Sequence, residues 1–427
     1  MRDDDLNLTN PTFFATGDPH AIFARLRRED PIHWTEGALN RGFWSVTRLA
    51  DIKTVFLNDN RVFSVQRFGA ALPQNAELED PETSYFLRLL RTGAQLSVMD
   101  GQPHAHLRRV FADRFSAPGV SGIEGVVRRC IDRIFDRVIE RGACDFTVDM
   151  AGRLPLMVIA DIMAIPDEDA EQLYRWNNMV AAPEDPEWSL GSALETSTTG
   201  VTGIMRYLAA MAHDRRGRPG DDLMSQLAQA EIGGIRLSDD QLGFNGLMFF
   251  AAGHETTRAA LSAGLLELIR APDQLEALRH DRFDPKALAT AGEEMVRWAS
   301  PLTHTLRTAT EDFDLNGTPI REGDWVVPWF ISANRDETAF ADAGRFDIRR
   351  SPNNHLGFAA GKHFCLGAHL ARLEMRLMLE TILDRLEDIE LTGAVEMAAS
   401  NLFWGIKHMP IRFKARIGST DARRAAA

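Results

Sequence analysis

Cysteine is scarce in this sequence, with Cys130, Cys144 and Cys365 as its three instances among 427 residues. None belongs to a Cys-x-x-Cys pair, and an odd number of cysteines argues against a disulfide framework. Cys130 lies in a helical pattern and Cys144 in a turn, so we interpret both as structural. Any cysteine with a chemical role must therefore be recognised by its surroundings, and those of Cys365 differ from the other two.

Long uninterrupted apolar runs are also missing. The N-terminus, MRDDDLNLTNPTFFATGDPH, has no apolar core of the length that a signal peptide needs. The longest apolar-rich stretch, Leu242–Leu266, is interrupted by polar and charged residues at its centre, whereas a membrane span needs about 20 apolar residues. We therefore expect a cytoplasmic protein with no membrane segment.

Positive charge is in deficit, with 48 basic against 61 acidic residues and a formal net charge of −13. Nucleic-acid-binding proteins present a basic surface, so this balance argues against a general nucleic-acid partner. It remains compatible with a local basic patch for an acidic protein partner. Hydrophobic residues make up 44% of the chain, which is ordinary for a globular protein with a sizeable core.

Helical periodicity dominates the pattern of apolar residues, whereas strand-like segments are short. Such segments cluster near the start (IHWTEG and GFWSVTR), towards the end (LRTATEDFDLNGTPIREGDWVVPWF) and in the tail (NLFWGIKHMPIRFKAR), where we expect a strand pair. The fold class predicted is α+β, predominantly α-helical, with one catalytic domain over residues 1–416 and a frayed tail over 417–427. Helices are predicted at Ile123–Val138, Leu154–Ile165, Thr202–His213, Gln241–Ile269, Pro285–Trp298 and Ala368–Leu386, and irregular stretches at Gln66–Ser97, Pro183–Thr199 and Gly344–Gly367.

The strongest local signal is the segment HLGFAAGKHFCLGAHLARLE around Cys365. This cysteine follows a loop rich in small residues and precedes an amphipathic helix that should start near Leu366. A helix N-terminus favours thiolate over thiol, because its unpaired N–H groups point at the sulfur. Glycines in the loop leave room for a flat cofactor, and a phenylalanine is placed to cover the sulfur. The residues expected to shape this site are Phe358, Gly361, His363 and Gly367.

The spacing Phe-x-x-Gly-x-His-x-Cys-x-Gly of this loop resembles the haem-binding loop of the cytochrome P450 family, and the resemblance extends over nearly the whole chain. It implies a cytochrome P450 fold with small edge sheets and non-covalently bound haem b, with Cys365 as the axial ligand of the haem iron. In that family the thiolate donates electron density to iron and favours O–O cleavage. Many relatives have a second glycine where this chain has Ala359, and we expect the additional methyl group to be tolerated.

A second motif, AGHETT, lies at the middle of the long predicted helix. Glycine and threonine lower helix propensity, and a threonine hydroxyl can bond to the i−4 carbonyl, so a local distortion is expected there. The motif resembles the family's oxygen-activation motif. This implies that Glu255 and Thr256 manage protons and that Ala252 and Gly253 leave space for O2. On the residues alone, an ion pair between Glu255 and Arg258 is an equal alternative.

Glu294 and Arg297 match the ExxR signature of the family, and residues at i and i+3 share one face of a helix. The resemblance implies a structural ion pair beneath the cysteine loop, completed by a later arginine. We consider Arg345 and Arg349 for that third position and prefer Arg345. Glu293 is the alternative partner of Arg297.

Haem carries two propionates, which need basic partners. The segment MDGQPHAHLRRVFADRFS resembles the family's propionate-contacting helix, and it places His104 and Arg108 at i and i+4 on one face. The resemblance adds Arg307 from a later strand and His363 from the cysteine loop. Arg109 is interpreted as a solvated neighbour.

The substrate side is less specific. The chain's ending resembles bacterial relatives that oxidise sterols, terpenoids or long aliphatic chains, and others that act on carrier-bound amino acids. We therefore expect a small, largely apolar substrate, free or tethered to a carrier protein. The polar residues Thr303, His304 and Thr305 indicate some hydrogen-bonding character. The residues predicted to line the pocket are Met248, Leu302, Thr303, Thr305 and Phe403.

The reaction implied is insertion of one oxygen atom from O2 into a C–H or C=C bond, as in secondary metabolism. Electrons are expected from NAD(P)H through a ferredoxin and its reductase, because the chain shows no flavin or iron–sulfur domain of its own. One alternative keeps the haem but changes the chemistry to a peroxide-driven peroxygenase or a haem-thiolate isomerase, against which the intact acid–alcohol pair argues. Another alternative is a non-catalytic haem- or ligand-binding protein.

Overall fold

The computed structural model describes residues 7–36, 42–59, 61–66 and 95–416. Helices form most of it, as predicted. The predicted frayed tail and nearly all of the irregular stretch Gln66–Ser97 lie outside the described residues. In chain order the helices are α2 (Pro11–Thr16), α3 (Pro19–Glu29), α4 (Leu49–Leu57), α7 (Gly101–Ala112), α8 (Ala117–Gly122), α9 (Glu124–Val138), α10 (Arg153–Met163), α11 (Asp167–Ala181), α12 (Ala193–Gly217), α13 (Leu223–Gln229), α14 (Asp239–Arg270), α15 (Pro272–His280), α16 (Pro285–Ala299), α17 (Phe330–Ala333) and α18 (Ala368–Arg385).

All six helices predicted from periodicity are present, with bounds that differ by a few residues or extend further. The stretch Pro183–Thr199 was predicted to be irregular, which is wrong for its second half. There Ser192 accepts a hydrogen bond from the backbone N–H of Glu195 and starts α12 at Ala193.

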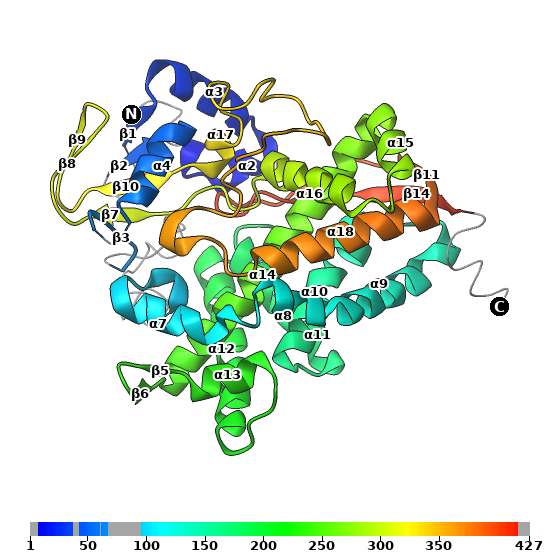
Figure 1. The fold of residues 1–427 in the computed structure, drawn as a ribbon, viewed down its shortest axis with the longest axis horizontal. Coiled ribbons are helices and arrows are strands. Elements are labelled where there is room, and N and C mark those ends of the chain that lie inside the picture. Colours follow the sequence, from blue (N-terminus) through cyan, green and yellow to red (C-terminus); the bar gives the residue numbers. More distant parts are fainter. Residues whose placement is uncertain (1–6, 37–41, 60, 67–94, 417–427) are drawn as a thin grey trace.

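The helix α14 passes through the middle of the molecule (Figure 1), where it packs against α10, α11, α12, α16 and α18. Its start is fixed by a capping box, in which the side chains of Ser238 and Gln241 bond reciprocally to backbone N–H groups. It ends where Pro272 begins α15. Most of its residues are buried because the helix is surrounded by other elements, which explains the apolar run in its sequence.

The strands form small sheets beside the helices. The largest has the order β1-β2-β10-β7-β3, in which β10 runs parallel to β2 and the other pairs are antiparallel. The strands are β1 (Ile32–Thr35), β2 (Phe43–Val46), β3 (Phe63–Ser64), β4 (Ala143–Asp145), β5 (Glu231–Ile232), β6 (Ile235–Arg236), β7 (Arg307–Ala309), β8 (Phe313–Leu315), β9 (Thr318–Ile320), β10 (Trp325–Pro328), β11 (Leu386–Leu391), β12 (Glu396–Met397), β13 (Ile406–His408) and β14 (Pro410–Ala415).

Two expectations about strands are wrong. The tail strands β13 and β14 do not pair with each other, since β13 pairs with β12 and β14 lies between β11 and β4. Cys144 was assigned to a turn, but it belongs to β4 and pairs with Ile411. Both errors arise because local pattern does not identify the partner of a strand, whether it is the nearby β12 for β13 or the distant β14 for β4.

Within the described ranges, none of the helices combines the length and the hydropathy that a membrane span requires.

Candidate functional site

The cysteine loop forms the centre of the candidate site. A short 3-10 turn, Gly361–His363, precedes Cys365, and α18 begins three residues after this cysteine. The Cys365 N–H donates to the carbonyl of Phe358 at 2.9 Å, which closes the loop. Burial raises the pKa of the Cys365 thiol, whereas the Gly367 N–H and the Arg108 and Arg372 guanidinium groups act in the opposite direction. Burial is the largest of these effects and the pKa stays raised, but the backbone and side-chain charges around the sulfur would support a thiolate.

Burial dominates at the other two cysteines as well. It raises the pKa of Cys130 to about 11 and that of Cys144 to about 12, although arginines near each of them act in the opposite direction. Cys365 differs from them in the backbone N–H of Gly367, which acts on its sulfur.

Phe358 is buried next to this cysteine and is itself held from the outside. The guanidinium carbon of Arg372 lies 4.5 Å from the centroid of the Phe358 ring. Arg372 Nε donates to Glu293 Oε1 at 2.6 Å, and His355 Nε2 lies 3.2 Å from Glu293 Oε2. Glu293 therefore does not compete for Arg297, which settles the alternative left open by the sequence.

Four predicted cofactor-binding residues come together on one side of the loop. The ring centroids of His104 on α7 and His363 are 4.3 Å apart. Burial, and then the charges of Arg307, His104 and Arg108, lower the pKa of His363 to about 2. Burial, followed by Arg108, also lowers the pKa of His104. Both imidazoles are therefore neutral, and the charge in this cluster belongs to the two arginines.

The two arginines already have partners in the fold. Arg307 donates to both carboxylate oxygens of Asp59, through Nε at 2.6 Å and Nη2 at 3.2 Å. Arg108 Nη2 donates to the carbonyl of Phe364 at 2.6 Å. Asp59 is thus a buried acid within the cluster, and no sequence pattern had pointed to it.

Several features of the cluster fit haem, the cofactor implied by the sequence. His363 Nε2 is buried and has no hydrogen-bond partner among the described residues, as expected of a donor that meets a propionate. Gly361 has φ +67°, and a Cβ there would lie 3.0 Å from the Phe56 carbonyl oxygen, so a side chain would crowd the loop. A Cβ at Gly367 would meet no described atom within 4 Å, which leaves room beside the sulfur.

The middle of α14 borders on an open space. Ala252 is exposed and Thr256 is half-buried, although most residues of this central helix are buried. The Thr256 hydroxyl donates to the Ala252 carbonyl at 2.9 Å, which is the i−4 bond expected from the sequence. A Cβ at Gly253 would lie 3.4 Å from Ile159 Cδ1 on α10. Gly253 therefore faces a neighbouring helix, and Ala252 is the residue beside the open space.

The Glu255 carboxylate is buried and pairs with Arg258. Arg258 Nε and Nη2 lie 3.2 and 2.5 Å from Glu255 Oε2. Burial alone would raise the pKa of Glu255, but Arg258 and His254 hold it at about 2. The ion pair that the sequence offered as an alternative is thus present, and it leaves Oε1 as the less engaged oxygen.

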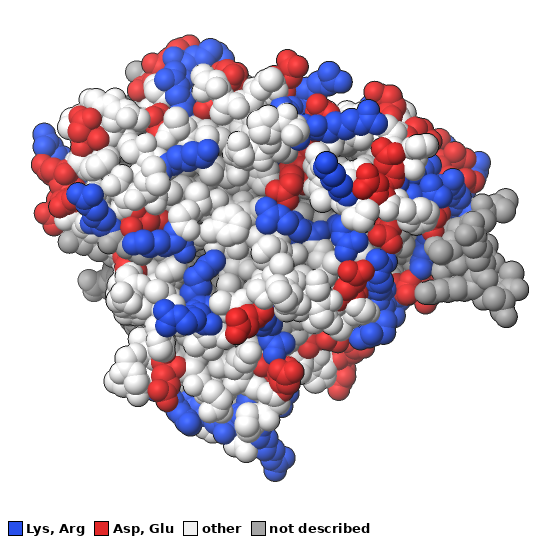
Figure 2. Space-filling view, viewed as in Figure 1, with Lys and Arg blue, Asp and Glu red and all other residues white. Residues whose placement is uncertain are grey.

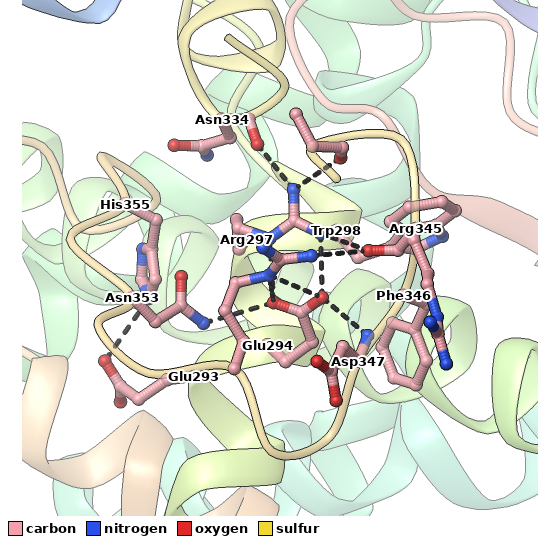
Figure 3. Close-up of polar contacts among 12 residues, drawn as sticks. Glu293, Glu294, Arg297, Trp298, Asn334, Arg345, Phe346, Asp347, Asn353 and His355 are labelled. Atoms are coloured by element: carbon pink, nitrogen blue, oxygen red, sulfur yellow. Dashed lines mark hydrogen bonds and ion pairs between the residues drawn. The ribbon is translucent and has the colours of Figure 1, made fainter. Parts of the chain in front are cut away.

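Glu294 and Arg297 form a fully buried pair on α16 (Figure 3), with two hydrogen bonds of 2.7 Å. The preference for Arg345 as the third member is wrong, and Arg349 is exposed. Arg345 supplies its backbone carbonyl to Arg297, whereas Arg350 Nε lies 3.1 and 3.2 Å from the two oxygens of Glu294. Three arginines stand close together in sequence, and only the path of the loop decides which one points inward.

The residues predicted to line the substrate pocket differ in whether their side chains are free to contact a substrate. Leu302 and Phe403 form a β-bridge and are half-buried, as is Met248 on α14. Thr303 is fully buried and its hydroxyl bonds to the Asn401 carbonyl, which argues against a substrate contact. Thr305 Oγ1 has no partner within the described part of the chain. His304 is also committed to the fold, since its ring lies against Trp329 at 4.7 Å.

Sequence reasoning missed Asp59, Arg350 and Arg372. Arg372 lies one turn into α18, the helix that directly follows the cysteine loop, so this position was a usable signal. Asp59 and Arg350 carried no such signal, because their partners are more than 50 residues away.

Comparison with known proteins agrees with this geometry. A protein-family model described as Cytochrome P450 matches residues 204–282 and 287–398. A steroid C26-monooxygenase of Mycolicibacterium smegmatis is 35% identical over 404 residues, covering 92% of this chain and 90% of the relative. A methyl-branched lipid omega-hydroxylase of Mycobacterium tuberculosis is 36% identical over 419 residues, covering 95% and 94%.

Solved structures give the same answer. A cytochrome P450 of Mycobacterium marinum in complex with pseudoionone superposes with a TM-score of 0.86 at 35% identity, covering 95% of this chain and 98% of that one. A structure from Novosphingobium aromaticivorans superposes with a TM-score of 0.83 at 29% identity, covering 96% and 98%. The cysteine loop, the buried ExxR pair and these likenesses together show that the chain belongs to the cytochrome P450 family of haem- and iron-containing enzymes and is a P450 monooxygenase for apolar substrates.

Proposed function

We propose that Cys365 is the axial ligand of haem iron, and that this chain hydroxylates an unactivated C–H bond with O2. The observation that carries the proposal is the position of this cysteine just before α18. There, backbone N–H groups and two arginines oppose the effect of burial on its pKa. When bound, haem would supply activation of O2, and the thiolate would favour O–O cleavage. The remaining steps belong to the side chains around it.

The cluster of His104, Arg108, Arg307 and His363 would bind the two propionates. His363 Nε2 and His104 are neutral donors, while the arginines provide charge. Because Asp59 already engages Nε and Nη2 of Arg307, we propose that this arginine is shared between the acid and a propionate. Phe358 would cover the sulfur, and Gly361 and Gly367 would let the macrocycle approach the loop.

Glu255 and Thr256 would deliver protons beside the Ala252 carbonyl. Thr256 holds its hydroxyl 2.9 Å from that carbonyl, at the point where α14 meets the open space. Glu255 remains ionised with a pKa of about 2, and because Arg258 engages only Oε2, Oε1 is the oxygen that would accept a proton and pass it on.

We further propose that the substrate is a branched aliphatic chain, oxidised at a terminal methyl group. The steroid C26-monooxygenase and the methyl-branched lipid omega-hydroxylase support this class. Thr305, whose hydroxyl has no partner among the residues described, would give the pocket one hydrogen-bonding position beside Met248, Leu302 and Phe403.

Electrons would come from NAD(P)H through a ferredoxin and its reductase. The face with α7 and α18 carries Lys and Arg side chains, with Asp and Glu among them, around uncharged surface (Figure 2). Near Cys365, Lys362 and Arg109 are exposed, and Phe364 is 39% exposed. An acidic ferredoxin would find positive charge and an apolar contact there. Lys362→Glu should therefore raise the ferredoxin concentration needed for half-maximal turnover by several-fold.

The first test is the absorption of the reduced protein with carbon monoxide, for wild type, Cys365→Ala and the matched control Cys130→Ala. A strongly red-shifted Soret band in wild type and Cys130→Ala, lost in Cys365→Ala, is the expected result. A histidine-like spectrum in wild type, or an unchanged band in Cys365→Ala, would overturn the ligand assignment.

The second test is turnover with NADH and a surrogate ferredoxin system on a sterol with a branched side chain, a methyl-branched fatty acid and an unbranched one. Terminal hydroxylation of the branched substrates is expected. Product from peroxide alone, with none from the reductase system, would instead favour the peroxygenase alternative.

A further inference from the structure

A buried polar cluster links α11 to α14 at Glu255. Asn177 on α11 and His254 on α14 are fully buried, and Asn177 Nδ2 lies 3.1 Å from His254 Nδ1. The same nitrogen of His254 lies 3.5 Å from Glu255 Oε1. The Tyr174 ring stands edge-on to the imidazole with centroids 5.3 Å apart, which fixes the plane of His254. One ring nitrogen is therefore approached by an amide and a carboxylate at once.

These two neighbours make different demands on His254 Nδ1. If the proton is on Nε2, Nδ1 accepts from the Asn177 amide, and Glu255 Oε1 has no donor. If the proton is on Nδ1, it is donated to Glu255 Oε1, and the Asn177 amide must turn its oxygen toward the ring. A single nitrogen cannot accept from one group and donate to the other, so Asn177 and Glu255 compete for it.

Neither arrangement satisfies every buried atom. Within the described residues, Asn177 Oδ1, His254 Nε2 and Glu255 Oε1 have no hydrogen-bond partner. Unpaired buried polar atoms are costly, and three of them in one cluster indicate a balance between alternatives in place of one fully bonded state.

The competition matters because of how Glu255 is already held. Arg258 engages only Oε2, through Nε and Nη2. If His254 also donates to Oε1, the carboxylate is held at both oxygens. If His254 accepts from Asn177, Oε1 stays free and the carboxylate keeps one oxygen with which to move a proton.

We propose that Asn177 and His254 form a positioning pair that keeps Glu255 able to move protons. Asn177 draws the lone pair of His254 Nδ1 to itself, and so prevents His254 from holding the second oxygen of Glu255. Since Asn177 belongs to α11, the seating of that helix against α14 controls the acid. The inference rests on the proposed role of Glu255 in proton delivery.

The test combines Asn177→Leu with His254→Phe. Asn177→Leu keeps the side-chain volume but removes the amide that competes for His254 Nδ1. His254 should then be protonated on Nδ1 and donate to Glu255 Oε1. Product formed per NADH should fall about three- to tenfold. Adding His254→Phe, which keeps the ring against Tyr174 but removes the donor, should restore product formed per NADH to within twofold of wild type. A purely structural role of Asn177 predicts no rescue by a second substitution in the same core.

Selective 15N-histidine NMR of the reduced carbon monoxide form provides a readout independent of turnover. The His254 signals, identified by their loss in His254→Phe, should shift toward the Nδ1-protonated tautomer in Asn177→Leu. The control Tyr174→Phe, on the same helix face, should change neither the His254 tautomer nor the product formed per NADH. An unchanged tautomer in Asn177→Leu, or no rescue in the double variant, would overturn the positioning pair.

Glu255→Gln separates this inference from the proposed function. If Glu255→Gln leaves product formed per NADH unchanged, the role of Glu255 itself fails. If Glu255→Gln lowers it and Asn177→Leu does not, the role of Glu255 stands and the positioning pair fails. The melting temperature and the substrate-induced spectral shift of each variant verify that folding and substrate binding are retained.

Discussion

The Nε atom of Arg350 lies 3.1 Å from Oε2 and 3.2 Å from Oε1 of Glu294, so a second guanidinium completes the buried pair with Arg297. Arg350 also donates to the carbonyls of Ala341 and Asp342. It thus joins a helix to the irregular segment that leads to the cysteine loop. Glu294 accepts further bonds from the Asp347 N–H and the Asn353 amide (Figure 3), so every lone pair of the buried acid is used.

Arg350→Ala should therefore destabilise the protein strongly. In this variant Arg297 still compensates the charge of Glu294, but Glu294 and the carbonyls of Ala341 and Asp342 lose a charged donor, which should cost about 2–4 kcal/mol. The measurement is the free energy of unfolding in denaturant. The control is Arg349→Ala, whose side chain is 72% exposed and which should change stability by less than about 0.5 kcal/mol. Equal effects of the two variants would contradict the inward assignment of Arg350.

Ala359→Gly should stabilise the cysteine loop. Ala359 has φ +58°, a left-handed conformation that costs a non-glycine residue about 1–2 kcal/mol. From the sequence, the question was only whether the Ala359 methyl group has room. The energetic cost of alanine at this position comes from its left-handed backbone conformation. Glycine would remove most of this conformational cost, but more backbone entropy would be lost on folding. We expect the free energy of unfolding to rise by about 0.5–1 kcal/mol.

The matched control for this loop is Ala360→Gly. Ala360 has φ −152°, which any residue adopts, so glycine there should lower stability by up to about 1 kcal/mol. If both variants are destabilised alike in thermal unfolding, backbone strain at Ala359 is refuted.

Glu374→Gln should become more stable than wild type as pH rises. Burial raises the pKa of Glu374 to about 8, against the opposing bond from Thr257, and Oε2 has no partner in the described part of the molecule. Between its ordinary value of 4.5 and about 8, the folded state keeps a proton that the unfolded state has lost. Wild-type stability should therefore fall with pH across this window, by up to about 1.4 kcal/mol per unit.

The measurement is the unfolding free energy at pH 5, 6.5 and 8. Glu374→Gln should lack the decline, while Glu311→Gln at an exposed position should follow wild type. If the unfolding free energy of wild type and of both variants declined alike with pH, the decline would arise from groups other than Glu374.

The segment 182–192, between α11 and α12, should loosen at alkaline pH. Burial lowers the pKa of His408, but the stronger combined effect of Glu187 and Asp145 raises it. His408 Nε2 lies 2.9 Å from Glu187, and Nδ1 lies 2.6 Å from Asp145. The other charged groups here are Lys407, Asp185 and Glu396.

The pKa of His408 is raised in the folded state. The stabilisation from its pairing with Glu187 and Asp145 is therefore fully present below the ordinary pKa of 6.5 and is lost as the pH rises through the folded-state pKa. Because the groups are partly exposed, the opening equilibrium should change only about two- to fivefold. Hydrogen exchange of residues 182–192, corrected for intrinsic rates, measures it between pH 6 and 9. His408→Gln should abolish the pH dependence, whereas His213→Gln should retain it.

The sequence by itself determined the features that are encoded locally. Helical periodicity predicted the six helices, and the spacing around Cys365 identified the family. The i and i+3 positions of Glu294 and Arg297 favoured their pairing, because a helix places such residues on one face, although Glu293 at i−4 stayed open as an alternative.

Only the tertiary structure decided which distant groups meet. Arg350 was chosen over Arg345 by the path of a loop, Asp59 met Arg307 across 248 positions, and Asn177 reached His254 from another helix. The left-handed backbone of Ala359 was likewise visible only in the folded loop. These contacts depend on packing between segments far apart in the chain, and no local pattern of side chains records that packing.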